Sequence, residues 1–233
     1  LANDQKPRFA EIQDEQAKLA KEFSDHVLDA TDSFVHLIAN PAELKGLPED
    51  AIAAAKELAT SKELEGWAFT LHFPSYFPVM QFSEDRSLRQ TLYQAYVTRA
   101  SELSEKFGSG KTEWDNTNNM LSQLRLKDEE AKMLGFANFA ALSLAPKMAK
   151  TVVEVDQFLT DFAKKAQAHG QKDWQELQLF AKDHLDLSSL EPWDMAYASE
   201  KLKQVRYAFS ENEVKQYFPL PKVLDGLFAL VQT

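Results

Sequence analysis

The chain has 233 residues and a formal net charge of -10, and it contains no cysteine. A chain of this length can bury a core without covalent staples, and the lack of cysteine excludes disulfides and thiolate metal sites. The acidic balance argues against a nucleic-acid ligand, because phosphate binding needs a basic surface. Apolar runs far shorter than the roughly 20 residues of a membrane span predict a cytoplasmic protein that contacts neither membrane nor nucleic acid.

A mainly helical fold is predicted by the scarcity of helix-breaking residues. The chain has only 7 glycines and 9 prolines, while Ala, Leu, Glu, Lys and Gln are abundant. The first helix is expected to begin near Pro7, because apolar residues recur at three- and four-residue steps from Phe9 to Ala30. The polar residues 31–33 are expected to interrupt this helix.

Two short strands are predicted, at about 33–38 and 67–73. Large apolar residues stand at every second position from Trp67 to Phe73, which is the period of a half-buried strand. Pro74 removes a backbone donor, so it is expected to end the strand and open a short turn or helix. We expect the two strands to pair as a small hairpin or strand pair.

The rest of the chain is predicted to be helical, with glycine-rich or polar breaks between helices. The apolar residues from Val152 to Phe162 are expected to face a core. Gly170 is expected to separate or kink the helix that contains them. The predicted segments are 48–61, 83–108, 116–134, 136–139, 151–184, 191–207 and 222–230.

The domain organisation is predicted from one polar stretch, 108–119, which allows either a single helical body or two lobes. We place an amino-terminal helical region with the short strands at 1–110 and a second helical region at 111–233. The apolar run 223–231 predicts that the second region is truncated at its carboxy end, as in a piece of a longer protein. No catalytic domain is expected within the chain.

Motifs for catalysis or metal binding are not found in the sequence. No H-E-x-x-H or G-x-S-x-G motif is present, and Gly108-Ser-Gly110 does not follow a predicted strand as a phosphate loop would. Each histidine is more simply a solvated or hydrogen-bonded side chain than a ligand. The five are His26, His36, His72, His169 and His184.

Aromatic side chains are the most ambiguous feature of the sequence. Core packing is their commoner role at such spacing, although they could also line a peptide-binding surface. Asp194 is interpreted as the acid of a helix start, because no charged partner for it can be placed from the sequence. The aromatic residues concerned are Phe73, Tyr76, Phe77 and Phe82, followed by Trp193, Tyr197 and Tyr207.

Several longer motifs occur in order along the chain, without large gaps between them. They are Leu71–Met80, Tyr96–Ser101, Trp114–Thr117, Leu134–Ala149, Pro192–Tyr197, Ser199–Lys203 and Tyr217–Phe228. Together they resemble the amino-terminal half of the thimet oligopeptidase family (M3) of zinc metallopeptidases, and its bacterial members in particular. The motifs are specific to that family, but none of them is catalytic.

The resemblance implies a mostly helical enzyme whose two lobes flank a deep channel, and which cuts short peptides and spares folded proteins. In the family, Zn²⁺ is held by the two histidines of H-E-x-x-H and a further glutamate, and the motif glutamate acts as general base. This sequence has no such motif, so no residue is carried over. Catalytic residues and metal ligands are therefore expected to be absent, and substrate-binding residues are unknown.

Two functions from different classes follow as expectations. The first is a part of a zinc oligopeptidase that forms scaffold and one channel wall, binds no zinc itself and is inactive alone. Its partner would be the missing carboxy-terminal catalytic region, and short peptides would be the substrates of the parent enzyme. The second is a free-standing helical module that binds peptides or a protein without catalysis. A metal-independent hydrolase ranks last, because no cluster of carboxylates or histidines is evident.

Overall fold

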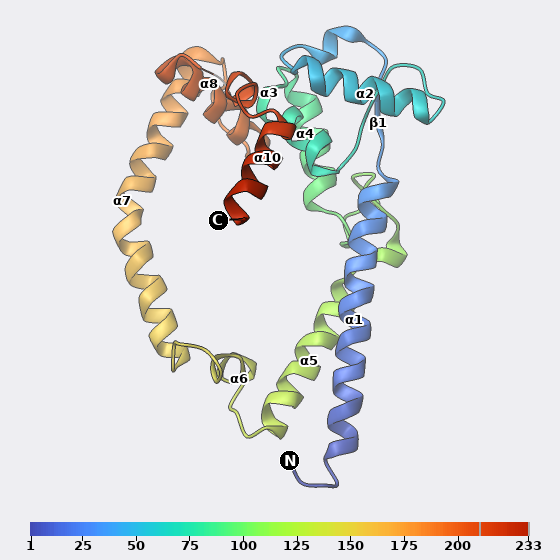
Figure 1. Ribbon diagram of the computed structural model, residues 1–233, viewed down its shortest axis with the longest axis vertical. Helices are drawn as coiled ribbons and strands as arrows, with labels where there is room; N and C mark the ends of the chain where they lie inside the picture. The colour runs from blue at the N-terminus through green and yellow to red at the C-terminus, as the bar shows by residue number, and fades with distance from the viewer. Residues whose placement is uncertain (210, 233) are drawn as a thin grey trace. The chain divides into compact units, whose positions relative to one another are not determined.

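The computed structural model describes residues 1–209 and 211–232, and it is mainly helical with one small sheet (Figure 1). This confirms the predicted fold class. The α-helices are α1 (Lys6–Ser33), α2 (Glu49–Ser61), α3 (Phe73–Phe82), α4 (Arg86–Val97), α5 (Thr117–Met133), α6 (Phe139–Leu144), α7 (Val152–His184), α8 (Met195–Tyr207), α9 (Glu211–Lys215) and α10 (Leu220–Val231). Short 3-10 helices are η1 (Pro41–Leu44), η2 (Thr112–Trp114) and η3 (Pro192–Asp194), and the strands are β1 (His36–Ile38) and β2 (Trp67–Phe69).

The chain forms two compact units, each built from two separate stretches of sequence. Unit 1 consists of Leu1–Val35 and Gln94–Asp173, and unit 2 consists of His36–Tyr93 and Trp174–Thr233. Two long helices, α4 and α7, therefore begin in one unit and end in the other. The division into regions 1–110 and 111–233 stays a prediction.

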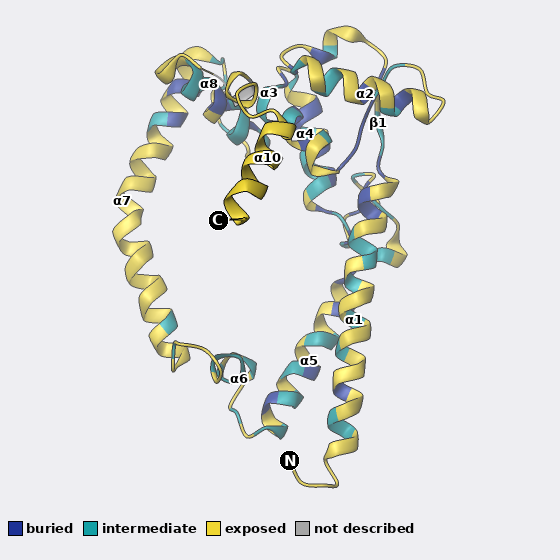
Figure 2. Ribbon diagram, in the orientation of Figure 1, coloured by how far each residue is buried: buried dark blue, intermediate teal, exposed yellow. Residues whose placement is uncertain are grey.

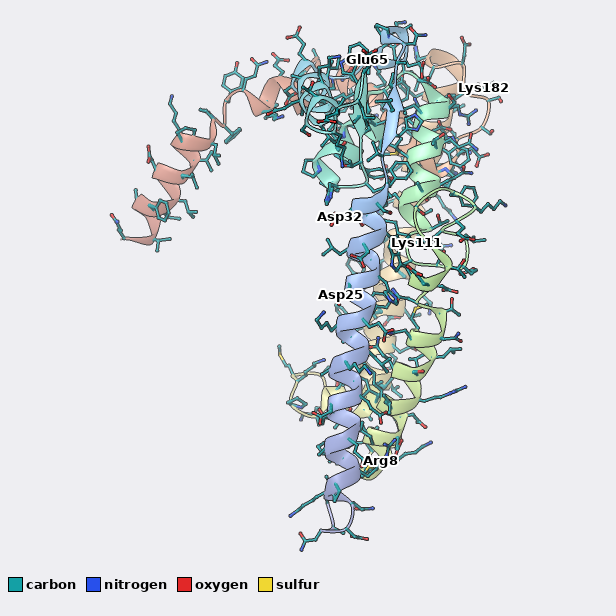
Figure 3. All side chains as sticks on the ribbon, turned by 90° about the vertical axis from the view of Figure 1, so that its right-hand side faces the viewer. Arg8, Asp25, Asp32, Glu65, Lys111 and Lys182 are labelled. Carbon is teal, nitrogen blue, oxygen red and sulfur yellow. The ribbon has the colours of Figure 1, made fainter. Side chains whose placement is uncertain are left out.

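Unit 1 is organised around the pairing of α1 with α5, which lie side by side in both ribbon views (Figures 1 and 3). Near the amino end of α1, Arg8 donates two hydrogen bonds to Glu129, at 2.8 and 2.9 Å. Further along, His26 Nδ1 lies 2.9 Å from Oδ1 of Asn116. The side chain of Ile12 is completely buried. Polar contacts at both ends and an apolar contact between them hold this pair together.

The first helix ends slightly later than predicted, because α1 includes the polar residues 31–33 and ends at Ser33. The hydroxyl of Thr31 donates to the carbonyl of Val27 at 2.7 Å, and that of Ser33 donates to Ala30 at 3.1 Å. Hydroxyl side chains that bond back to the preceding turn can remain within a helix. The hydroxyl residues that predicted a turn therefore form their hydrogen bonds within the helix.

The two predicted strands pair antiparallel in unit 2, as expected, with His36 opposite Phe69. The second strand is shorter than predicted, because it ends at Phe69 and not at 73. The next backbone N–H, that of Thr70, donates to the hydroxyl of Ser75 at 3.0 Å and so leaves the ladder. Leu71 is buried as well, so the apolar alternation reflects a buried loop that leads into α3.

Two other boundaries differ from the predicted ones. α4 ends at Val97 instead of near 108, and Ala100 takes a left-handed φ of 50°, which a helix cannot contain. The short helix expected to start within 136–139 begins at the last of these residues, Phe139, because Asn138 caps it by accepting from the backbone N–H of Ala141 at 3.0 Å.

The long helix α7 corrects two predictions at once. It runs without interruption through Gly170, so the expected break there is wrong. Most of α7 within unit 1 is exposed (Figure 2). The side chains of Phe158 and Phe162 are exposed by 69% and 66%, although they were expected to face a core. The helix is amphipathic as predicted, but no other part of unit 1 covers its apolar face along this stretch.

A substitution at Gly66 tests the turn into β2. Gly66 has a φ of +115°, and a Cβ there would lie 2.3 Å from the carbonyl oxygen of Ile38. We expect Gly66→Ala to lower the free energy of unfolding by about 2 kcal/mol or more. The matched control is Gly170→Ala in α7, where a Cβ meets no atom within 4 Å and should stabilise by about 0.5–1 kcal/mol. Urea unfolding of the three proteins measures both effects, and equal effects would contradict the assigned geometry.

His36 makes unit 2 sensitive to pH. Burial in β1 lowers the pKa of His36 below its usual value of 6.5, although Glu43 and Asp85 partly oppose this shift. The unfolded chain therefore binds a proton more readily, so the contribution of His36 to stability is complete above about pH 6.5 and falls as the pH drops below it. We expect His36→Gln to flatten this part of the stability profile. His169→Gln, on an exposed position of α7, is the matched control for the loss of a histidine.

Candidate functional site

A groove in unit 2, which we call the α3 groove, is the best candidate for a binding surface. It has a volume of about 560 Å³ and lies between α2, α3 and the segment around α9. Its lining is mainly apolar, and three prolines make much of its wall rigid. The lining residues are Pro48, Asp50, Ala51, Ala54, Pro74, Pro78, Gln81, Phe82, Val214, Lys215 and Phe218.

The four aromatic side chains of α3 have different surroundings. Tyr76 is buried, as the core interpretation predicts, and Phe82 is half-buried and lines the α3 groove. Phe73 and Phe77 are exposed by 59% and 36%, so the core interpretation is wrong for them. Their rings stack with centroids 4.9 Å apart. A stacked, exposed aromatic pair can contact an apolar side chain of a ligand.

The second aromatic group is also divided. Trp193 and Tyr197 are half-buried, and Trp193 makes an edge contact with Tyr93 at 6.1 Å between ring centroids. Tyr207 is exposed by 59%, which contradicts its expected place in the core. The position of Tyr207 at the last turn of α8 explains this, because the chain turns away at Ala208 with a left-handed φ of 55°.

One ion pair stands at the rim of the α3 groove. The Lys215 ammonium contacts the Asp50 carboxylate, and this contact lowers the pKa of Asp50 although burial opposes the shift. A second hollow of about 800 Å³ shares Pro48, Phe82 and this ion pair with the α3 groove and extends towards Lys201. Apolar walls with a charged rim favour binding of an amphipathic ligand over catalysis.

A buried ionic cluster was not predicted from the sequence. Asp194 is completely buried and accepts from two arginines: Arg86 Nη2 donates to Oδ2 at 2.6 Å, and Arg89 Nη2 donates to Oδ1 at 2.8 Å. The backbone N–H of Glu191 donates to Oδ2 at 3.0 Å, so Asp194 does act at a helix start, as predicted. The arginine partners, more than 100 positions earlier, carried no local signal in the sequence.

The arginines fix the start of α4 against η3. Arg89 is 1% exposed and also donates to the carbonyls of Ser83 and Trp193, at 2.6 and 3.2 Å. Its guanidinium lies 4.2 Å from the ring centre of Tyr197. Burial alone would raise the pKa of Asp194, but the hydrogen bonds from the arginines and the backbone hold it below its usual value. Each side-chain nitrogen of Arg89 and both carboxylate oxygens of Asp194 thus have a partner inside the protein, which indicates a structural role for the cluster.

No zinc ligand set is found in the part of the chain that the structure describes. Among residues 1–209 and 211–232, no three His, Asp or Glu side chains gather closely enough to hold a metal ion. His26 instead contacts Asn116, and His184 packs on the ring of Phe180 at 4.9 Å. The described residues therefore do not fit a catalytic zinc site.

Replacement of Asp194 tests the ionic cluster. Asp194→Asn leaves the buried Arg89 guanidinium without its counter-charge, so we expect a loss of about 3–5 kcal/mol in the free energy of unfolding. Asp183→Asn, on an exposed position of α7, is the matched control and should change stability by less than about 0.5 kcal/mol. Urea unfolding monitored by circular dichroism gives both values. A loss below about 1 kcal/mol for Asp194→Asn would contradict the structural role.

None of the described helices combines the length and apolar character needed to span a membrane.

Comparison with known proteins places the sequence among peptidases. The chain is 44% identical over 232 residues to oligopeptidase A of Escherichia coli, covering 100% of this chain and 34% of that protein. It is 39% identical over 242 residues to the probable cytosolic oligopeptidase A of Arabidopsis thaliana, covering 33% of that protein. The dipeptidyl carboxypeptidase of Escherichia coli is 28% identical over 231 residues.

The chain spans about a third of the length of these curated relatives. The likeness to bacterial oligopeptidase A agrees with the motifs found in the sequence. The profile of Peptidase family M3 matches residues 79–233, which is more than half of the chain. The chain therefore belongs to Peptidase family M3, as its sequence motifs predicted.

Proposed function

We propose that this chain is the amino-terminal part of a cytoplasmic zinc metallo-oligopeptidase that hydrolyses short peptides. The observation that carries the proposal is the 44% identity to oligopeptidase A along the whole of this chain. One relative is named as cytosolic, which supports a cytoplasmic location for this protein, and another is named as chloroplastic or mitochondrial. The zinc belongs to the parent enzyme, because the described residues offer no ligand set.

Within such an enzyme, the chain would supply scaffold and one wall of the substrate channel. Long helices with rigid ionic and hydrogen-bonded contacts suit a wall that admits an extended peptide and excludes a folded domain. The missing carboxy-terminal catalytic region would be its partner. We also propose the division into regions 1–110 and 111–233, with no catalytic residue in either.

A second candidate is a free-standing helical module that binds peptides or a protein. The α3 groove and the stacked pair Phe73 and Phe77 favour it, because apolar walls beside exposed aromatic rings can hold a peptide without any chemistry. The two candidates differ in one respect that can be measured. Only the first predicts that activity appears when the rest of the peptidase is supplied.

Zinc content and peptide cleavage of purified 1–233 test the proposal. We expect less than about 0.1 zinc per chain by elemental analysis, because a stoichiometric site needs three or four ligands. We also expect no cleavage of a quenched fluorescent peptide. The control is Escherichia coli oligopeptidase A, assayed side by side, with and without a chelator.

Other outcomes would separate the alternatives. One zinc per chain, or cleavage that a chelator abolishes, would overturn the expected inactivity of the chain alone. Peptide binding by 1–233 without cleavage, lost in Phe77→Ala, would favour the binding module. Phe77 is suited to this test because its exposed ring adds little to the core.

A further inference from the structure

The first part of α7 is exposed along most of its length (Figure 2), and it carries an apolar stripe in which Val155 alone is half-buried and the other members are exposed. We call it the α7 stripe: Val152, Val155, Leu159, Phe162 and Ala166, with Phe158 at its edge. Leu159 is exposed by 58%, and Phe158 and Phe162 by more. Scattered exposed apolar residues are ordinary, but a continuous stripe of this length indicates an interaction surface.

The spacing within the α7 stripe shows what kind of surface fits it. Its members are three or four residues apart over four helical turns, which is the a and d pattern of a helix that packs against another helix. A sheet or an extended peptide does not require this repeat. The matching partner is therefore an amphipathic helix with its own apolar seam.

The residues beside the α7 stripe add a charge preference. Lys165 and Lys172 stand seven residues apart along one edge, and both are exposed. The other edge carries Asp156, Ala163 and Gly170. Ala163 and Gly170 are small enough to allow a close approach, and Asp156 adds one negative charge at the amino end of this edge. A partner helix with acidic residues on one edge and larger apolar residues on the other is complementary to this surface.

We propose that the α7 stripe docks an amphipathic helix from the two thirds of the peptidase that this chain does not span. The relatives align with 100% of this chain, yet the match covers only 34% of oligopeptidase A from Escherichia coli. The remaining polypeptide is thus long enough to supply the helix. This inference rests on the proposed function, and it adds the surface through which the parts of the enzyme assemble.

A chimera tests the docking surface. In it, this chain replaces the matched third of Escherichia coli oligopeptidase A. Leu159→Glu and Phe162→Glu are made both in the chimera and in 1–233. We expect each to lower the thermal midpoint of the chimera by about 5 °C or more and its peptidase activity at least tenfold, because each buries a charge at the interface. The same changes should move the midpoint of 1–233 by about 1 °C or less.

Control variants on the opposite face of the same helix introduce the same charge. Gln157→Glu and Gln171→Glu should leave both proteins unchanged, because these positions lie away from the α7 stripe. Unchanged midpoint and activity in the chimera with Leu159→Glu would overturn the proposal. Equal destabilisation of 1–233 would also overturn it, since the stripe would then be covered by its own chain.

The isolated chain gives an independent test that does not depend on folding of the chimera. Sedimentation of 1–233 should show a monomer, with or without Leu159→Glu. A dimer that Leu159→Glu dissociates would show that the stripe binds a second copy, against the proposal. A chimera that depends on the stripe for stability but binds no zinc and cleaves no peptide would support the docking surface and contradict the proposed function.

Discussion

The buried carboxylate of Asp194, held between Arg86 and Arg89, is the interaction on which unit 2 depends. It joins the start of α4 to η3, two segments that are far apart in the sequence. A buried charge is tolerated only when its partners and remaining hydrogen bonds are all in place. The backbone donor at Glu191 and the carbonyls bound by Arg89 meet this condition. The cluster therefore specifies how these segments meet more than it adds net stability.

A second constraint is the balance between covered and uncovered apolar surface. The small sheet and the helices around it bury Phe69, Leu71 and Val79 almost completely. In contrast, α10 in unit 2 and the part of α7 in unit 1 are exposed along much of their length (Figure 2), and many of their exposed residues are apolar. Within an enzyme three times as long, such helices would form the surfaces through which regions meet. Apolar faces and rigid buried links thus suit the proposed role as scaffold.

Much of the helical fold could be predicted, because the signals for it are local. Apolar residues at helical spacing located α1, α5 and α8 to within a few residues, and the proline and acidic residues of a helix start located α2. Two of the wrongly predicted element ends depend on single side chains. The hydroxyls of residues 31 and 33 form hydrogen bonds within α1, which therefore includes them. The hydroxyl of Ser75 accepts from the backbone N–H of Thr70, which therefore does not pair in the sheet. The α3 groove could only be suspected from its aromatic residues. The sequence did not show which rings would face solvent.

What the sequence determined by itself is the family and the helical class. Family motifs and helical periodicity are properties of neighbouring residues, so they can be read without a fold. The tertiary structure alone decided that Asp194 is paired with two arginines, that Phe73 and Phe77 stack in the open, and that the apolar face of α7 is uncovered in unit 1. These features depend on contacts between segments far apart in the chain. Periodicity shows that a face is apolar, but only packing shows what covers it.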